Sequence, residues 1–265
     1  MLPRCERFDR PTQGPLGETS LQIAPEAASA LIEILGRLGE EPGAAARAWP
    51  GPSLPPRALA CSRGMRYPPC RARSRDGMTD EPKVKGVAFR SVVASFGKLR
   101  GEPLQKRSLD EMCEPLRDGI RYGSLVSTGW YPIAWYKDLF QAIRRTTGEG
   151  KELIHQIGRQ CTHDDMSGIY KVIAGLISPS TLFSLGQRVF SNYYSAGHVR
   201  VLESRRGFTR ALWIGCHGFD ENMWTEVIGS CEQLLVIGGA DHVRQRIISG
   251  GGDNDDHLEL TAHWS

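Results

Sequence analysis

The chain has 265 residues, is 40% hydrophobic and 24% charged, and carries a formal net charge of +3 at pH 7. No stretch reaches the roughly 18 consecutive apolar residues of a membrane-spanning helix, and the N-terminus lacks the apolar run of a secretory signal, so we expect a cytoplasmic protein with no membrane span. The basic excess lies in residues 1–77, whereas residues 78–265 hold 22 residues of each sign and no basic block, so we expect no nucleic-acid partner.

The composition changes at Met78. Residues 1–77 contain 11 of the 16 prolines and no lysine, and only Pro25–Leu38 has helix-like apolar spacing. Two interpretations stay open for this leader: a disordered basic arm, or upstream sequence with translation beginning at Met78. The sequence therefore predicts a disordered leader or a mis-assigned start over residues 1–77, followed by a single globular α+β domain over residues 78–265.

The first part of this domain has the apolar spacing of helices. Proline at a first-turn position marks two of the helix starts, and Ser178 is a candidate N-cap for the last. In chain order, helices are predicted over Phe89–Leu99, Leu104–Leu116, 132–148, Lys151–Cys161, from Asp164 or Asp165 to Ile177, and from Pro179 to Gly197.

After Gly197 the apolar pattern alternates, as it does in strands. Two hairpins flank one amphipathic helix, for which Asp220 is the candidate N-cap. Helices followed by the order ββαββ predict an α+β fold, in which an antiparallel sheet carries helices on one face. The strands are predicted over His198–Glu203, Phe208–His217, Val243–Ser249 and His257–Trp264.

Several catalytic motifs are absent from the sequence. It contains no G-x-x-x-x-G-K-[ST], G-x-G-x-x-G, G-x-S-x-G or H-E-x-x-H pattern, which counts against NTPases, Rossmann dehydrogenases, serine hydrolases and zincins but not against enzymes in general. The seven cysteines include no C-x-x-C pair, so reduced, buried thiols are expected. No cofactor is identified.

The densest polar cluster surrounds the end of the predicted helix Lys151–Cys161. His155, His163, Asp164 and Asp165 offer the imidazole and carboxylate ligands that suit zinc or iron. Eight residues separate the two histidines, a little over two helical turns, so they could share a metal only if the helix breaks. The alternative is a helix C-terminus followed by an aspartate cap for the next helix.

Aromatic side chains are frequent in the helical part. Such a set is typical of a packed core, but it could also line a pocket for a flat or lipid-like ligand, since buried tyrosine and tryptophan prefer a polar partner. The candidate pocket residues are Trp130, Trp135, Tyr136, Tyr170, Phe190 and Tyr194.

Four segments in combination resemble a family of paralogues of unknown function found in Myxococcales: Thr128–Tyr136, Asp164–Tyr170, Ser178-Pro179 and Asn192–Gly197. The resemblance covers residues 78–264 and none of the leader. Members are distantly similar to 4-vinyl-reductase-type domains, haem nitric-oxide-binding domains and transport-particle subunits, which implies a small-molecule-binding or docking module by analogy. Relatives often end with two cysteines around a Gly-Asp turn; Gly252-Asp253 is present here without them.

Three hypotheses follow. The first is a non-catalytic sensor or adaptor domain that binds a small apolar ligand or a protein partner. The second is a metal-dependent enzyme that uses the His/Asp cluster. The third is a structural docking or oligomerisation module, for which a homodimer is one form.

Overall fold

The computed structural model of the protein describes residues 81–166 and 178–265. The predicted leader and most of the helix expected to end at Ile177 lie outside these residues. Within them, no helix is both long and apolar enough to cross a membrane.

The N-terminal half consists of helices with two short strands that pair antiparallel, Val84 opposite Tyr131. The helix predicted over Leu104–Leu116 is two helices instead, because Pro115 lacks an N–H and fits only the first turn of a new helix. Pro132 belongs to a strand and precedes the next helix. The elements are β1 (Lys83–Lys85), α2 (Gly86–Arg100), α3 (Glu102–Asp110), α4 (Glu114–Arg121), β2 (Trp130–Pro132), α5 (Ile133–Thr147) and α6 (Lys151–Asp165).

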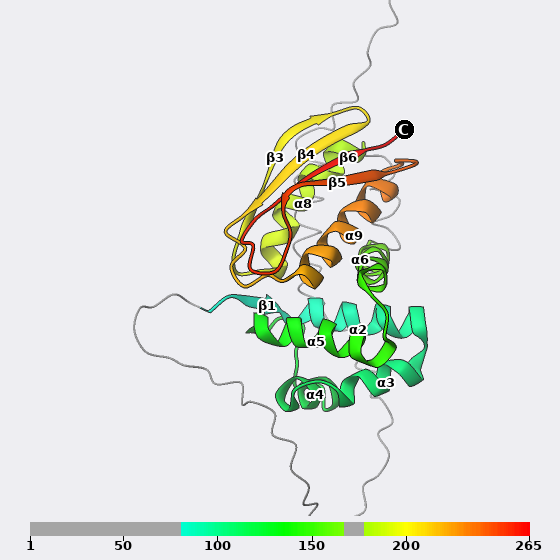
Figure 1. Ribbon diagram of the computed structural model, residues 1–265, viewed down its shortest axis with the longest axis vertical. Helices are drawn as coiled ribbons and strands as arrows, with labels where there is room; N and C mark the ends of the chain where they lie inside the picture. Colours follow the sequence, from blue (N-terminus) through cyan, green and yellow to red (C-terminus); the bar gives the residue numbers. More distant parts are fainter. Residues whose placement is uncertain (1–80, 167–177) are drawn as a thin grey trace, which may run out of the picture.

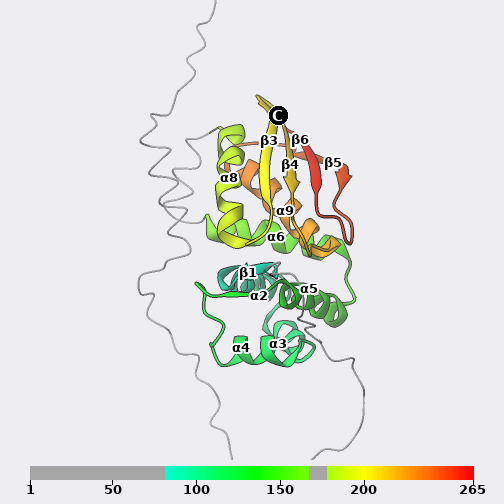
Figure 2. The same cartoon turned by 90° about the vertical axis from the view of Figure 1, so that its left-hand side faces the viewer.

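The C-terminal half confirms the predicted ββαββ order and the α+β class. Its four strands form one antiparallel sheet in the order β3-β4-β6-β5. Figures 1 and 2 show α8 and α9 against one face of this sheet, with α2 to α5 forming a further layer below α6. The elements are α8 (Pro179–Tyr193), β3 (His198–Arg205), β4 (Phe208–Ile214), α9 (Glu221–Ile237), β5 (Arg244–Gly250) and β6 (Leu258–His263).

Both predicted N-caps are confirmed. The Asp220 carboxylate accepts a hydrogen bond from the Met223 N–H at 3.0 Å, and Ser178 Oγ accepts one from the Thr181 N–H at 3.3 Å. Each cap satisfies one of the backbone donors left free at a helix start, which fixes where α9 and α8 begin.

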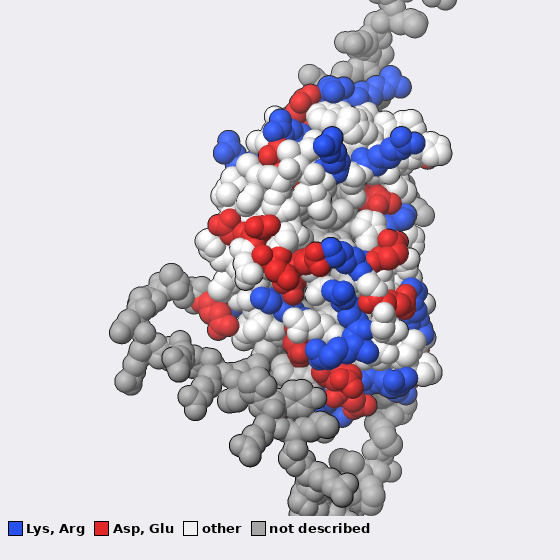
Figure 3. Space-filling view, viewed as in Figure 1, with Lys and Arg blue, Asp and Glu red and all other residues white. Residues whose placement is uncertain are grey.

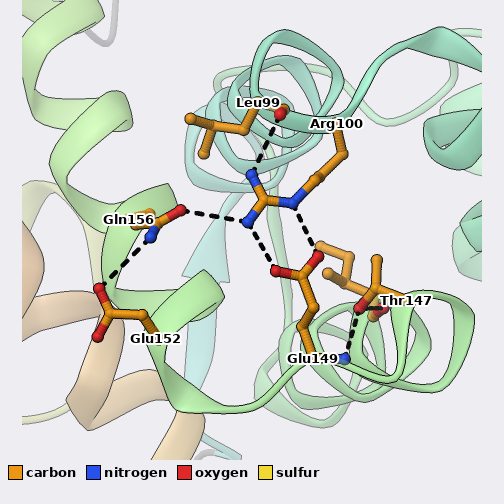
Figure 4. A network of polar contacts seen from close by, with 7 residues as sticks. Leu99, Arg100, Thr147, Glu149, Glu152 and Gln156 are labelled. Carbon is orange, nitrogen blue, oxygen red and sulfur yellow. Dashed lines mark hydrogen bonds and ion pairs between the residues drawn. The ribbon is translucent and has the colours of Figure 1, made fainter.

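An ion pair joins the end of α2 to the turn between α5 and α6 (Figure 4). Arg100 donates through Nε and Nη2 to both Glu149 carboxylate oxygens, at 2.7 and 2.6 Å, and through Nη2 to Gln156 Oε1 at 3.3 Å. The Arg100 hydrogen bond lowers the pKa of Glu149. Because the pair is partly exposed, we expect it to orient α6 more than to stabilise the fold.

Strand pairing brings arginines together at one end of the sheet. Arg205, Phe208, His263 and Arg244 lie opposite one another across the four strands. In Figure 3 basic side chains predominate at the upper end of the molecule, whereas both signs alternate lower down. The chain order hides this cluster, because its members come from separate strands.

Helices α6 and α9 pack at very short range. A Cβ on Gly158 would overlap the carbonyl oxygen of Glu226, and a Cβ on Gly229 would overlap that of His155. The two glycines therefore let the backbones approach more closely than side chains would allow. Around this contact lie the fully buried Ile154 and Ile157 of α6 and Trp224 of α9.

We expect Gly158→Ala to lower the free energy of unfolding by about 1–3 kcal/mol, because the added methyl group forces α6 and α9 apart. This loss of stability should occur although alanine is about 1 kcal/mol more favourable than glycine inside a helix. Urea unfolding checks it, with Gly119→Ala in α4 as control, since a Cβ there would make only ordinary contacts with Leu125 at 3.4–3.9 Å. Equal stability of the wild type and Gly158→Ala would contradict the close packing.

Candidate functional site

A partly open cavity of about 160 Å³ lies between α2, α5, α6, α8, α9 and the sheet. Its walls are predominantly apolar, with residues from every one of these elements. They include Ala88 and Val92 of α2, Leu182, Phe183 and Phe190 of α8, Val199 of β3, Trp213 of β4, and Val227 and Leu234 of α9. Native interiors hold few voids larger than a water molecule, so a cavity of this size marks the site.

Glu226 of α9 is a buried carboxyl on the cavity wall. Tyr194 donates its hydroxyl to Glu226 Oε2 at 3.2 Å, and Ser230 donates to Oε1 at 3.0 Å. Burial, with a smaller contribution from the nearby Asp165, raises the pKa of Glu226 to about 7, although the two hydroxyl donors act in the opposite direction.

Asp165, the last residue of α6, is the second carboxyl on the wall. Ser91 Oγ and the Tyr193 hydroxyl each donate to it at 3.3 Å. Burial raises the pKa of Asp165 to about 6, although both hydrogen bonds oppose the rise. Its neighbour Asp164 points elsewhere and pairs with Lys98 at 2.9 Å.

Two thiols complete the polar part of the lining. Cys161 of α6 and Cys231 of α9 both line the cavity, and both are free. Burial strongly raises the pKa of each thiol. They are therefore protonated at neutral pH and act as weak donors rather than as nucleophiles.

Three of the six predicted pocket residues, Tyr136, Phe190 and Tyr194, line the cavity. Trp130 is 43% exposed, and Trp135 stacks on Tyr131 with ring centroids 5.7 Å apart, outside the lining. Tyr170 lies outside the described residues. The aromatic content of the sequence does not distinguish residues that line the cavity from residues outside it. Ligand contact by any of the six stays a prediction.

The structure does not bring the predicted metal ligands together. His155 faces Glu232 of α9 at 3.3 Å, His163 is half exposed beside Asp164, and only Asp165 reaches the cavity. Helix α6 continues unbroken through Asp165, so the two imidazoles stay apart. Among the residues that the structure describes, no group of three His, Cys, Asp or Glu side chains is placed to hold a metal.

Sequence reasoning missed Glu226 and its partner Ser230. They lie one helical turn apart on the face of α9 that also carries Val227, Cys231 and Leu234 toward the cavity. The available signal was an acidic residue on an apolar helix face, in a helix segment that contains no lysine or arginine. A carboxyl in such a place has no neighbouring cation along its own helix.

The comparisons with known proteins concern the fold. No family model matches the chain, and no curated protein matches it. An Fe(II) unliganded H-NOX protein from K. algicida has a TM-score of 0.52 at 10% identity, over 68% of this chain and 96% of that chain. A mutant H-NOX protein from K. algicida has a TM-score of 0.53 at 12% identity, over 68% of this chain and 96% of that chain. A mutant Tt H-NOX protein has a TM-score of 0.51 at 12% identity, over 68% of this chain and 95% of that chain. This likeness shows a shared fold, as the resemblance to haem nitric-oxide-binding domains implied.

The buried carboxyls predict how stability depends on pH. The folded-state pKa of Glu226, about 7, lies above its ordinary value of 4.5. The stabilising contribution of the protonated form is therefore complete below about pH 4.5 and is lost as the pH rises through 7, by about 3 kcal/mol for Glu226. Asp165 adds a smaller loss of the same sign, up to about pH 6.

Urea unfolding between pH 5 and 8 measures this effect. We expect Glu226→Gln to flatten the profile and to be more stable than the wild type at pH 8, whereas exposed Glu152→Gln should leave the profile unchanged. A wild-type profile that is flat between pH 5 and 8 would show that Glu226 ionises as it does in water.

Proposed function

We propose that the protein is a non-catalytic small-molecule-binding domain, a sensor or adaptor, whose ligand occupies the cavity between α6, α8, α9 and the sheet. The observation that carries the proposal is the cavity itself, about 160 Å³ of mainly apolar space in an otherwise packed core. An apolar space of this size that no side chain fills lacks the contacts of a packed core. A ligand that fills it recovers the lost contacts, as benzene does in an engineered cavity of about 150 Å³.

A haem group does not fit this cavity. Drug-sized ligands fill pockets of roughly 300–1,000 Å³, and a porphyrin is no smaller than these. None of the seven histidines lines the cavity, and among the described residues the lining contains no lysine or arginine to pair with propionates. The thiols of Cys161 and Cys231 are held protonated. We therefore assign no haem chemistry to the protein, although its structural neighbours are H-NOX proteins.

The finer parts of the sequence prediction belong to the same proposal. These finer parts are membership of the Myxococcales family, a cytoplasmic location and a single domain that begins at Met78. Docking of a protein partner or of a second copy is the alternative, and the exposed apolar side chains of Tyr122, Val126 and Trp130 favour it. They follow one another from the end of α4 to β2.

Toluene is the first probe of the cavity. We expect saturating toluene to raise the melting temperature of the full chain by a few degrees, because it binds the folded state alone. Ala88→Leu fills part of the cavity from α2 and should abolish the shift. Ala94→Leu, the same substitution at an exposed position of α2, should retain it.

Circular dichroism of both variants separates a blocked cavity from a misfolded chain. Equal shifts for the wild type and Ala88→Leu would place toluene elsewhere. No shift in the wild type would show that a neutral apolar ring does not bind the cavity, and would favour the docking alternative.

A further inference from the structure

The charge of the cavity lining is one-sided. Of the side chains that line it in the described residues, two carry carboxyls, Asp165 and Glu226, and none is a lysine, an arginine or a histidine. Lys98 pairs with Asp164 instead, and Arg159 pairs with Glu232 at 3.1 Å on the other side of α6 and α9. Among the described residues, these two basic side chains of α2 and α6 are therefore paired with other carboxylates.

The two carboxyls have room for another donor. A carboxylate offers about four lone-pair sites. Glu226 uses one on each oxygen, for Tyr194 and Ser230. Asp165 accepts from Ser91 and Tyr193. All four hydroxyl groups are neutral donors, so among the described residues neither carboxylate is hydrogen-bonded to a cation, although Lys98 acts on Asp165 from a distance.

This one-sided charge discriminates between ligand classes. An apolar cavity commonly suggests a carboxylic acid with a hydrocarbon tail. Here the ligand carboxylate would be buried beside Glu226 and Asp165 with no cation from the described lining residues, which costs several kcal/mol. A protonated amine instead supplies the missing positive charge and donates N–H groups.

We propose that the ligand is a small organic amine, which binds as a cation with its ammonium group against Glu226 and its apolar part among Val227, Phe190 and Trp213. Asp165 is the second acceptor at the same polar end. The inference rests on the proposed function, since it names the class of ligand that the cavity takes. A cavity of about 160 Å³ limits that ligand to approximately the size of one substituted ring.

A matched series of probes tests the charge preference: benzylamine, toluene and benzoate, each titrated into the full chain at pH 8 by isothermal calorimetry. The three share one ring and differ in charge. We expect benzylamine to bind about 10- to 100-fold more tightly than toluene, the factor that corresponds to a hydrogen bond with a charged group. Benzoate should bind more weakly than toluene.

Glu226→Gln assigns the preference to one side chain. The amide keeps the shape of the side chain but not its charge, so the advantage of benzylamine over toluene should fall about tenfold or more, while toluene binding stays unchanged. Glu232→Gln is the matched control, on the same helix but outside the lining, and should leave both affinities unchanged.

The pH dependence provides a second readout. Among the described residues, the titratable groups that interact with Glu226 come from four elements: Asp165 and Cys161 from α6, Tyr136 from α5, Tyr193 and Tyr194 at the end of α8, and Cys231 from its own helix. Between pH 6 and pH 8 benzylamine stays protonated while Glu226, with a pKa of about 7, becomes ionised. Benzylamine affinity should rise about tenfold over this range in the wild type and remain flat in Glu226→Gln.

The outcomes separate the two proposals. If toluene binds and benzylamine binds no more tightly, the amine assignment is overturned and the cavity remains a small-molecule site. If benzoate binds most tightly, the assignment is likewise overturned. If none of the three probes binds, both the amine assignment and the proposed function fail.

Discussion

Helix α6 meets helix α9 at two glycines, and the site depends on this contact. Gly158 packs against the backbone of Glu226, and Gly229 packs against that of His155. Cys161 and Asp165 follow Gly158 by one and two turns and so reach the same cavity as Glu226 and its neighbours. A wider separation of the helices would move the two carboxyls apart and would change the volume that they border.

The same helix pair divides its charges between two sides. His155 and Arg159 pair with Glu232 on the outer side, and Lys151 pairs with Glu221. These pairs are partly exposed and add little stability. Their consequence is that the described basic side chains of α6 pair away from the cavity, where Asp165 and Glu226 are the only charged groups among the described lining residues. The rest of the described lining is mainly apolar surface from α2, α8, α9 and the sheet.

The sequence predicted the elements better than the site. The change from helical to alternating apolar spacing at Gly197, and the caps Ser178 and Asp220, define local structure, so they could be identified without tertiary information. The cavity joins side chains that only tertiary packing brings together. Trp130 and Tyr136 illustrate the limit: both belong to one aromatic run, yet the first is exposed and the second is buried.

A shared fold with H-NOX proteins leaves the ligand open, because function depends on the residues that a fold presents. Here the decisive residues are the two carboxyls, and they act on each other. The charge of Asp165 raises the pKa of Glu226, so the ionised state of one disfavours that of the other. A cation between the polar groups favours ionisation of both. If the cavity binds an amine as proposed, ligand binding and proton release from the two carboxyls are linked, and occupancy alters the charge beside α6, α8 and α9.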